Sequence, residues 1–183
     1  FLMEQFARIG KALSSPQRLK LVELLAQAER TVEQLASVTG LSIANTSQHL
    51  QVLLRARLVN NRKDGLYVHY SLADAAVYAL WRSMQLLGET RLAEVREFLA
   101  EEFDDGAEAD AVTPDALQER IRSGEVTLID VRPAEEYRHG HLPGAISMPV
   151  DEIESRLGEL SKDGEVVAYC RGPYCLLGPN AVR

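Results

Sequence analysis

Cysteine is scarce in this chain of 183 residues, which contains only Cys170 and Cys175. Two cysteines are too few to build a secreted fold that depends on disulfides. The sequence has no run of eighteen or more apolar residues, which excludes a membrane-spanning helix. No signal-peptide pattern precedes the first helix, although the sequence opens at Phe1. These absences predict a cytoplasmic protein that does not bind a membrane.

The chain as a whole also lacks an excess of basic charge, since its net charge is −7. Residues 1–100 nevertheless carry twelve Lys and Arg against nine Asp and Glu, a charge of +3, whereas residues 101–183 carry eight against eighteen, a charge of −10. This asymmetry predicts two modules with different partners. We expect one domain at 1–100, an acidic linker at 101–112 and a second domain at 113–183. Because phosphate contacts are local and screened within about 10 Å, the negative total does not exclude DNA binding.

The first 56 residues follow a helical period in four segments. Ser14-Ser15-Pro16 separates the first two helices, because it stops one helix and starts the next. Thr31 is the expected N-cap of a third helix that Gly40 ends. Ser42 is the expected N-cap of a fourth helix that reaches about Ala56.

The period then changes to that of strands. Strands are predicted at 58–62 and 66–72, with Lys63-Asp64-Gly65 as the turn of a hairpin. One long helix is predicted from Ala73 to about Leu99, with enough apolar residues to need a cover. The order of helix, short turn, helix and hairpin is that of a winged helix-turn-helix, a mainly α fold.

The predicted fourth helix has two distinct faces. Thr46, Leu50 and Leu53 recur at helical spacing and are expected to face the core. The opposite face is small and polar and has no acidic residue, so the helix can enter a major groove, where glutamine pairs with adenine. Basic residues near the hairpin tip suit phosphate or minor-groove contacts. For any single residue, the alternative is a solvated position. The residues predicted to contact DNA are Ile43, Ala44, Asn45, Ser47, Gln48, Gln51, Arg62 and Lys63.

Residues 3–99 resemble the ArsR/SmtB family of bacterial repressors. The resemblance rests on the run Leu41–Leu53 (LSIANTSQHLQVL), on Arg57-Leu58-Val59 with the hairpin, and on the opening Ser14–Leu19. It implies a homodimer built from the first and last helices, and a short palindromic operator in double-stranded DNA.

Metal-sensing members of that family use Cys or His on the helix before the DNA-reading helix, or on the last helix. Neither residue type occurs at 31–36 or at 73–100. His49 and His69 are isolated in the sequence and are read as structural. Without a thiolate cluster or a His and carboxylate spacing, we predict no metal site. We predict no cofactor either.

Helix and strand patterns alternate after the linker. This alternation predicts an α/β domain with a parallel sheet. The predicted helices span 114–123, 135–139 and 151–160, and the predicted strands span 126–131, 145–150 and 166–169.

The last predicted strand leads directly into Cys170, in a loop that also contains Gly172 and Pro173. Ligands bind at the carboxyl edge of a parallel sheet. Backbone N–H groups in such a loop, and the helix after it, would lower the pKa of a thiol and hold an anionic persulfide or thiosulfate. We therefore expect Cys170 to attack a sulfane sulfur, with Arg171 supplying a fixed positive charge. The alternative is a structural cysteine at a strand end.

Cys175 has two equally weighted interpretations. It is either a resolving thiol that closes a disulfide with Cys170, which requires Cα atoms within about 7 Å, or a small buried hydrophobe.

The second domain resembles the rhodanese family of thiosulfate sulfurtransferases over about residues 113–183. The motifs are Leu128–Pro133 (LIDVRP), Glu135–Tyr137 (EEY), Gly140–Ala145 (GHLPGA) and Cys170–Cys175 (CRGPYC). The resemblance implies Cys170 as the nucleophile of a six-residue active loop.

The remaining positions of this domain have structural alternatives. The active loop contains Gly172, Pro173 and Tyr174. Asp130 and Arg132 end the first strand at the same rim as this loop, where they either form an ion pair or contact substrate, and we favour the ion pair. His139 and His141 are read as residues that fix loops.

Two departures limit this reading. Related phosphatases and arsenate reductases place an arginine six positions after the cysteine, where this chain has Leu176, so phosphoryl transfer is not expected. The sequence ends at Arg183, where a rhodanese fold should continue with the rest of a helix, a strand and another helix. We therefore expect the C-terminal part of the domain to be missing.

Together these features predict a DNA-binding transcriptional regulator, expected to be a repressor, whose second domain senses or handles reactive sulfur or a redox signal through Cys170. The alternative is a sulfurtransferase that forms a Cys170 persulfide from a small donor such as thiosulfate, with the DNA-binding half secondary. A third alternative is a constitutive DNA-binding protein with an inactive second domain.

Overall fold

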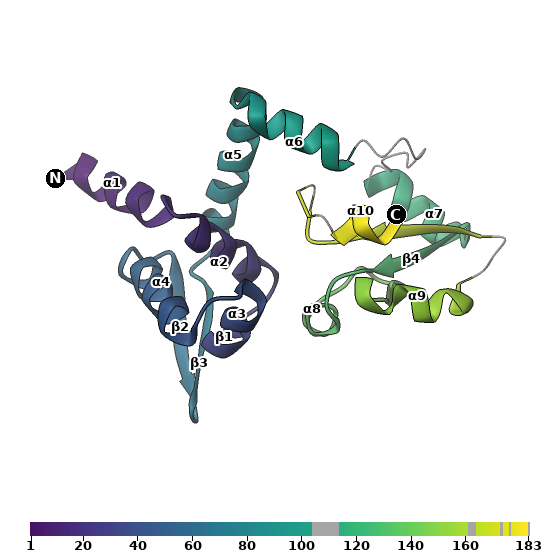
Figure 1. Cartoon of the computed structure of the whole chain (residues 1–183), viewed down its shortest axis with the longest axis horizontal. Helices are drawn as coiled ribbons and strands as arrows, with labels where there is room; N and C mark the ends of the chain where they lie inside the picture. Colours follow the sequence, from purple (N-terminus) through teal and green to yellow (C-terminus); the bar gives the residue numbers. More distant parts are fainter. Residues whose placement is uncertain (104–113, 161–163, 173, 176, 183) are drawn as a thin grey trace. The chain divides into compact units, whose positions relative to one another are not determined.

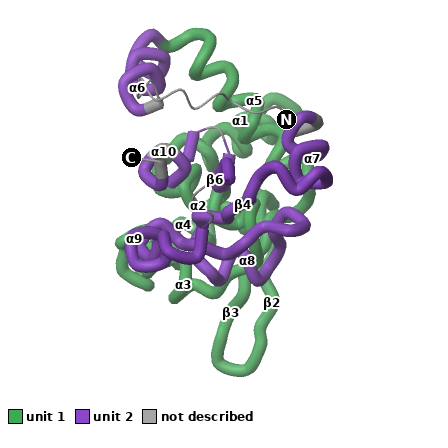
Figure 2. Tube along the Cα trace, turned by 90° about the vertical axis from the view of Figure 1, so that its right-hand side faces the viewer, with its two compact units in different colours: residues 1–92 green, residues 93–183 purple. Residues whose placement is uncertain are grey.

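A computed structural model describes residues 1–103, 114–160, 164–172, 174–175 and 177–182. The chain divides into two compact units, residues 1–92 and residues 93–183, which Figure 2 colours separately. Most of the predicted linker, residues 104–112, lies outside the described residues. Among the helices of the described ranges, none combines the length and hydropathy needed to cross a bilayer.

The first unit consists of helices that pack around a small antiparallel sheet (Figure 1). The sheet has the strand order β1-β3-β2, and the β2–β3 hairpin forms the wing. This arrangement confirms the predicted winged helix-turn-helix. Its elements are α1 (Leu2–Leu13), α2 (Pro16–Gln27), β1 (Arg30–Thr31), α3 (Val32–Thr39), α4 (Ile43–Arg55), β2 (Val59–Asp64), β3 (Tyr67–Leu72) and α5 (Ala75–Arg91).

Local signals set the ends of α3 and α4. The Thr31 side chain accepts a hydrogen bond from Gln34 N, and the Gln34 side chain accepts one from Thr31 N, which forms a capping box. Gly40 ends α3 with a φ of 72°, a conformation that glycine adopts without steric cost. Ser42 caps α4 through Asn45 N. These three predicted caps are confirmed.

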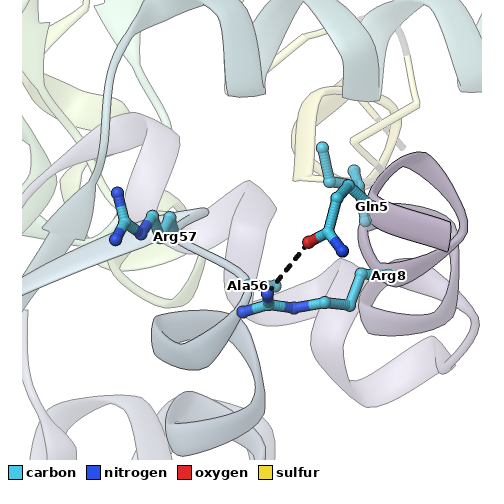
Figure 3. A pocket seen from close by; sticks show the side chains of 5 residues that line it. Gln5, Arg8, Ala56 and Arg57 are labelled. Carbon is cyan, nitrogen blue, oxygen red and sulfur yellow. Dashed lines mark hydrogen bonds between the residues drawn. The ribbon is translucent and has the colours of Figure 1, made fainter. Parts of the chain in front are cut away.

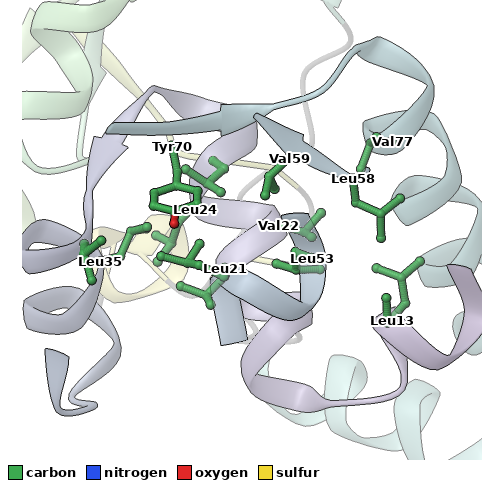
Figure 4. Packing of buried hydrophobic residues seen from close by; sticks show 14 residues of the cluster. Leu13, Leu21, Val22, Leu24, Leu35, Leu53, Leu58, Val59, Tyr70 and Val77 are labelled. Atoms are coloured by element: carbon green, nitrogen blue, oxygen red, sulfur yellow. The ribbon is translucent and has the colours of Figure 1, made fainter. Parts of the chain in front are cut away.

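The core of the first unit is mainly aliphatic, and both its helices and its strands contribute side chains to it (Figure 4). Leu21 and Val22 of α2 meet Leu50 and Leu53 of α4, and Tyr70 of β3 closes the cluster. Thr46 is also fully buried. The predicted inner face of α4 is therefore the face that packs, which leaves its other face directed away from the core.

The hairpin and the last helix of this unit differ from prediction. Strand β2 continues through Asp64, which pairs with Tyr67, so the turn is Gly65-Leu66 rather than 63–65. A two-residue turn with positive φ at its first residue alone fits the twist of a hairpin. The predicted helix 73–99 is interrupted at Leu92, whose backbone is extended, so α5 ends at Arg91 and α6 follows. In the turn before this break, the Thr90 hydroxyl donates to Leu86 O, and such back-bonding bends helices.

The second unit contains a parallel sheet of strand order β5-β4-β6. In the view of Figure 1, α7 lies on one side of β4 and α9 on the other. The predicted parallel α/β domain is confirmed. Its elements are α6 (Ala93–Phe103), α7 (Pro114–Ser123), β4 (Val126–Asp130), α8 (Ala134–His139), β5 (Ile146–Ser147), the 3-10 turn η1 (Val150–Glu152), α9 (Ile153–Arg156), the 3-10 turn η2 (Leu157–Glu159), β6 (Glu165–Tyr169) and α10 (Leu177–Val182).

Three boundaries in this unit also differ from prediction. Helix α6 extends to Phe103, into the start of the predicted linker. The strand predicted at 145–150 pairs only at Ile146–Ser147, because Pro149 has no N–H to continue a ladder and begins the turn η1. The helix predicted at 151–160 is divided into η1, α9 and η2. Ile129, Val131 and Met148 form the buried core beneath these elements.

Candidate functional site

The outer face of α4 is accessible along its first turns. Ile43, Ala44, Asn45 and Gln48 are exposed, and Ser47 is partly exposed. This face has no acidic residue, so nothing on it repels phosphate. The structure thus brings the predicted DNA-contacting residues of α4 together on one accessible face.

Gln51, one helical turn further along α4, is tied to the core. Its Nε2 donates to the hydroxyl of buried Tyr70 at 3.1 Å. This bond fixes the orientation of α4 against β3. The bond uses one N–H of the Gln51 amide and restricts its orientation, so Gln51 is less free than the exposed Gln48 to adapt to a base.

The two basic residues of the wing are in different situations. Arg62 pairs with His69 across the hairpin and Lys63 pairs with Val68, so their side chains alternate between the two faces of the ribbon. Lys63 is exposed. Arg62 donates from Nη2 to Glu29 Oε1 at 2.6 Å and from Nη1 to Asp64 Oδ2 at 3.0 Å. The side-chain hydrogen bond to Glu29 is the largest of the effects that raise the pKa of Arg62.

An arginine-lined pocket of about 380 Å³ lies between α1 and the end of α4 (Figure 3). Gln5, Arg8, Ile9, Ala56 and Arg57 line it. Arg8 donates to Gln5 Oε1 at 3.3 Å and also bonds the carbonyl of Arg55, which ties α1 to the end of α4. Arg57 follows the C-cap of α4 with a φ of 60°, a left-handed conformation that is uncommon for a residue with a side chain.

In the second unit, β6 delivers Cys170 to the carboxyl end of the sheet, as predicted. The Cys170 sulfur lies 3.4 Å from Cys175 O and 3.7 Å from Gly172 O. Cys170 is partly exposed and Cys175 is buried. Pro173, predicted in the same loop, lies outside the described residues, whereas Tyr174 is partly buried.

The side chains of the two cysteines are hydrogen-bonded to each other. A hydrogen bond between their side chains raises the pKa of Cys170, and burial adds to the effect. The same bond lowers the pKa of Cys175 to about 6, with help from the backbone N–H groups of Arg171 and Leu177. The Cys170 sulfur faces two carbonyl oxygens, which accept hydrogen bonds from a thiol, and this geometry agrees with a raised pKa of Cys170 and a lowered pKa of Cys175. Coupled thiols of this kind lose their protons in two steps that belong to the pair.

Arg171 does not turn its guanidinium into the loop. It is paired with Glu136 of α8, whose side chain is only 1% exposed, through bonds of 2.7 Å from Nη2 and 3.0 Å from Nε. The predicted fixed charge is therefore held by a buried carboxylate. It still acts through space, because the Arg171 charge contributes to lowering the pKa of Cys175.

Asp130 and Arg132 form the ion pair that the sequence analysis favoured. Arg132 Nη2 donates to Asp130 Oδ2 at 2.6 Å and to Gly140 O at 2.8 Å. Tyr169 donates to the same Asp130 oxygen at 2.6 Å. Burial raises the pKa of Asp130, but the bonds from Arg132 and Tyr169 outweigh it, and the net pKa is lowered. Burial and the bond to Asp130 raise the pKa of Tyr169 to about 12.

The two histidines of this unit, predicted to fix loops, both contact α8: His139 bonds within that helix, and His141 bonds from the segment that follows it. The Nδ1 atom of His139 lies 2.8 Å from Glu135 O, and that of His141 lies 2.9 Å from Tyr137 O. The His141 ring also stacks on Tyr137, with 3.7 Å between centroids. Within the described part of the chain, no group of three or more His, Cys, Asp or Glu side chains is arranged to hold a metal ion.

Two family models match the chain, one in each unit. Residues 15–61 match the arsR family of bacterial regulatory proteins, and residues 113–180 match the rhodanese-like domain. The HTH-type transcriptional regulator Rv0324 of Mycobacterium tuberculosis is 44% identical over 182 residues, which cover all of this chain and 80% of that protein. The chain belongs to the ArsR family and carries a rhodanese-like domain.

Other relatives match one part of this ArsR-family regulator. The transcriptional repressor SmtB homolog of Synechocystis is 40% identical over 81 residues, 44% of this chain and 61% of that protein. The putative sulfur carrier protein YrkF of Bacillus subtilis is 30% identical over 106 residues, 55% of this chain and 57% of that protein. A solution structure of a homodimeric winged helix-turn-helix domain from Mycobacterium bovis is 38% identical, covers 51% of this chain and 86% of that one, and has a TM-score of 0.48.

Two contacts of this regulator's sites were not predicted. Glu29 is 33 residues from Arg62, and Glu136 is 35 residues from Arg171, so no local motif joins either pair. Strand β1, which brings Glu29 beside β3, is only two residues long and has no period of its own.

Proposed function

We propose that this ArsR-family regulator is a homodimeric repressor that binds a palindromic operator and responds to sulfane sulfur or an oxidant at the Cys170–Cys175 loop. The observation that carries the proposal is that one loop holds both cysteines, with the Cys170 sulfur 3.4 Å from Cys175 O and the two thiol side chains hydrogen-bonded. A thiolate that is available near neutral pH reacts with electrophilic sulfur, whereas an ordinary buried cysteine does not. A DNA-binding regulator with reduced thiols acts in the cytoplasm.

The first chemical step forms a persulfide. With thiosulfate, the Cys175 thiolate takes the proton from Cys170 as the Cys170 sulfur attacks the outer sulfur of the donor. A new S–S bond forms, the S–S bond of thiosulfate breaks, and sulfite leaves with the electron pair. The Cys170 thiol becomes a persulfide without any other oxidant.

The second step closes a disulfide. After Cys175 has lost its proton to solvent, its thiolate attacks the inner sulfur of the Cys170 persulfide, and hydrosulfide leaves. Over both steps, two thiols are oxidised to one disulfide, and thiosulfate is reduced to sulfite and sulfide. The disulfide removes the thiolate charge and cross-links the two ends of the loop. Either change can alter how the unit packs.

Apolar side chains on α1 and α5 support the homodimer. Met3 and Phe6 of α1, and Leu86 and Leu87 of α5, are exposed, with Phe6 at 56%. Exposed apolar groups on two helices of a small unit are typical of an association surface. In a two-fold dimer the same patch serves both protomers, and it sets the spacing of the two α4 helices on a palindrome. Sedimentation of Phe6→Glu at micromolar concentration tests this, since a dimer should dissociate.

The deciding experiment pairs intact mass with DNA binding. An operator is first selected from a pool of random duplexes, and the protein is then exposed to thiosulfate or polysulfide. An added sulfur, or the loss of two hydrogens, together with a changed operator affinity supports the sensor. Cys170→Ser should abolish both changes, and Cys175→Ser should stop at the persulfide. Modification with unchanged affinity would show that the two units are uncoupled.

A second candidate function is that of a sulfurtransferase, and the match of residues 113–180 to the rhodanese-like domain favours it. An enzyme would pass the sulfur of the Cys170 persulfide to a thiol acceptor and return to its starting state. Steady-state release of sulfite from thiosulfate with a thiol acceptor, at many turnovers per protein, supports the enzyme. A single turnover followed by a stable modification supports the sensor.

A further inference from the structure

Four side chains on the outer face of the wing form a cluster that the proposed function does not use. Arg62 of β2 lies between Glu29, which precedes β1, and Asp64 at the end of β2. A second bond of 3.3 Å joins Arg62 Nε to Glu29 Oε2, so the contact with Glu29 has the two-point geometry of a strong pair. His69 of β3 completes the cluster, with Nδ1 at 3.6 Å from Glu29 Oε1.

Successive side chains of the β2–β3 hairpin point to opposite faces, which separates this cluster from Lys63. Cross-strand partners share a face, so Arg62 and His69 lie on one face, and Lys63 lies on the other with Val68. Arg62, Glu29 and Asp64 carry one positive and two negative charges, which sum to −1. Among the residues that the structure describes, Lys63 has no carboxylate partner, and it is exposed. The wing therefore offers DNA one available cation and one that is already neutralised.

We propose that Glu29 is a positioning residue that holds Arg62 away from DNA and thereby raises the discrimination between operator and random sequence. The proposal rests on the DNA binding proposed above. To contact a phosphate of random DNA, Arg62 must give up its two carboxylate partners. The exchange therefore adds little to the affinity for random DNA. An operator that places a phosphate or a narrow minor groove beside the wing offers a better partner. Arg62 then leaves Glu29 and Asp64 and contacts the DNA.

The expected effect of Glu29→Gln is a gain of affinity for random DNA. Gln removes the charge that holds Arg62 but keeps the size of the side chain. A freed Arg62 adds about one phosphate contact per protomer, so the slope of log affinity against log salt should steepen by about 0.9 per protomer. We expect binding of a random 30-base-pair duplex to tighten by about 3- to 10-fold at low salt. The gain is modest because a single exposed ion pair contributes little free energy. Operator affinity should rise less, so the ratio between the two should fall.

The experiment is a double-mutant cycle in the full chain, read by fluorescence anisotropy on the random duplex and the selected operator over a range of salt. The variants are Glu29→Gln, Arg62→Ala and the two together, and Asp64→Asn is a second way to release Arg62. Glu33→Gln on α3 is the charge-matched control, because Glu33 is exposed and is not paired with Arg62. Thermal melting of each variant checks that it folds.

The cycle separates the outcomes. If the gain from Glu29→Gln disappears in the Arg62→Ala background and exceeds the gain from Glu33→Gln, the proposal stands. An equal gain in both backgrounds, or the same gain from Glu33→Gln, means that only the overall charge matters and overturns it. If Glu29→Gln does not tighten the binding of random DNA at all, the proposal is also overturned. If the unaltered protein binds neither duplex, the proposed function itself fails, which is a different result.

Discussion

The buried pair Glu136–Arg171 provides a test of what holds the cysteine loop in place. Glu136→Gln keeps the shape of the side chain and one oxygen acceptor but removes the charge. The Arg171 guanidinium, 17% exposed, would then lose its carboxylate partner in a nearly dry position. Breaking a buried pair from one side costs about 3–5 kcal/mol. Because Gln still accepts one bond and Arg171 reaches some solvent, we expect a loss of about 2–4 kcal/mol, a large part of the 5–15 kcal/mol that keeps a domain folded.

Hydrogen exchange is the suitable assay, because it reports each unit separately. The N–H groups of β4 and β6 bond to carbonyl oxygens of the neighbouring strand, so we expect their exchange to report the unfolding of the second unit. A loss of 2–4 kcal/mol should speed their exchange by about 30- to 1,000-fold. The only tryptophan, Trp81, lies in α5 of the first unit, so its fluorescence in urea should show an unchanged midpoint.

The matched control is Glu154→Gln on α9, which makes the same chemical change at an exposed position. It should shift stability by less than about 0.5 kcal/mol. If Glu136→Gln leaves exchange in β4 and β6 within this range, then the pair contributes no net stability, and the argument that it anchors the loop is wrong.

Three further predictions concern the core, the rim and the thiols. Leu50→Ala, at a fully buried position, should destabilise the first unit by about 2–5 kcal/mol, measured by Trp81 fluorescence in urea, and a loss below about 1 kcal/mol would contradict the packing. Tyr169 has a folded pKa of about 12, above its unfolded value near 10, so its bond to Asp130 stabilises fully below pH 10 and is lost as the pH rises toward 12. The stability difference between the unaltered protein and Tyr169→Phe, measured by exchange or urea, should therefore shrink in that window, and a constant difference would refute the assignment. Alkylation of the loop by iodoacetamide should rise with a midpoint near pH 6, and Cys175→Ser should move it toward the value near 8.5 of an ordinary thiol; a midpoint that stays near 6 would assign the thiolate to Cys170.

Much of the fold could be predicted from the sequence because its signals are local. The caps at Thr31 and Ser42 and the αL glycine at position 40 each act within four residues, so the helix boundaries follow from short patterns. The order of those elements, with the hairpin after α4, then identified the winged helix-turn-helix. The alternation of helix and strand patterns after the linker predicts the parallel sheet in the same way.

What could not be predicted depends on partners far along the chain or on small backbone differences. Strand β1 exists only because Arg30 pairs with Tyr70, forty residues away in number. The interruption at Leu92 has no proline or glycine at that position to announce it. The turn at Gly65-Leu66 differs from the predicted one by a short slip of register, which the Asp-Gly pattern does not fix. The first and the last depend on strand pairing that outweighs local preference, whereas the break at Leu92 follows the Thr90 back-bond in the preceding turn.

The same distant pairing changes the chemistry expected of the cysteine loop. Both arginines near it are committed to buried carboxylates, Arg171 to Glu136 and Arg132 to Asp130. A sulfur anion on Cys175 is supported first by the hydrogen bond from the Cys170 side chain and then by the backbone N–H groups of Arg171 and Leu177. These donors belong to the loop and to the start of the helix after it, so the anion depends on the conformation of the loop. Loss of Glu136 should therefore weaken thiolate formation by releasing the loop, and the alkylation midpoint of Glu136→Gln should rise above 6 even though the arginine is still present.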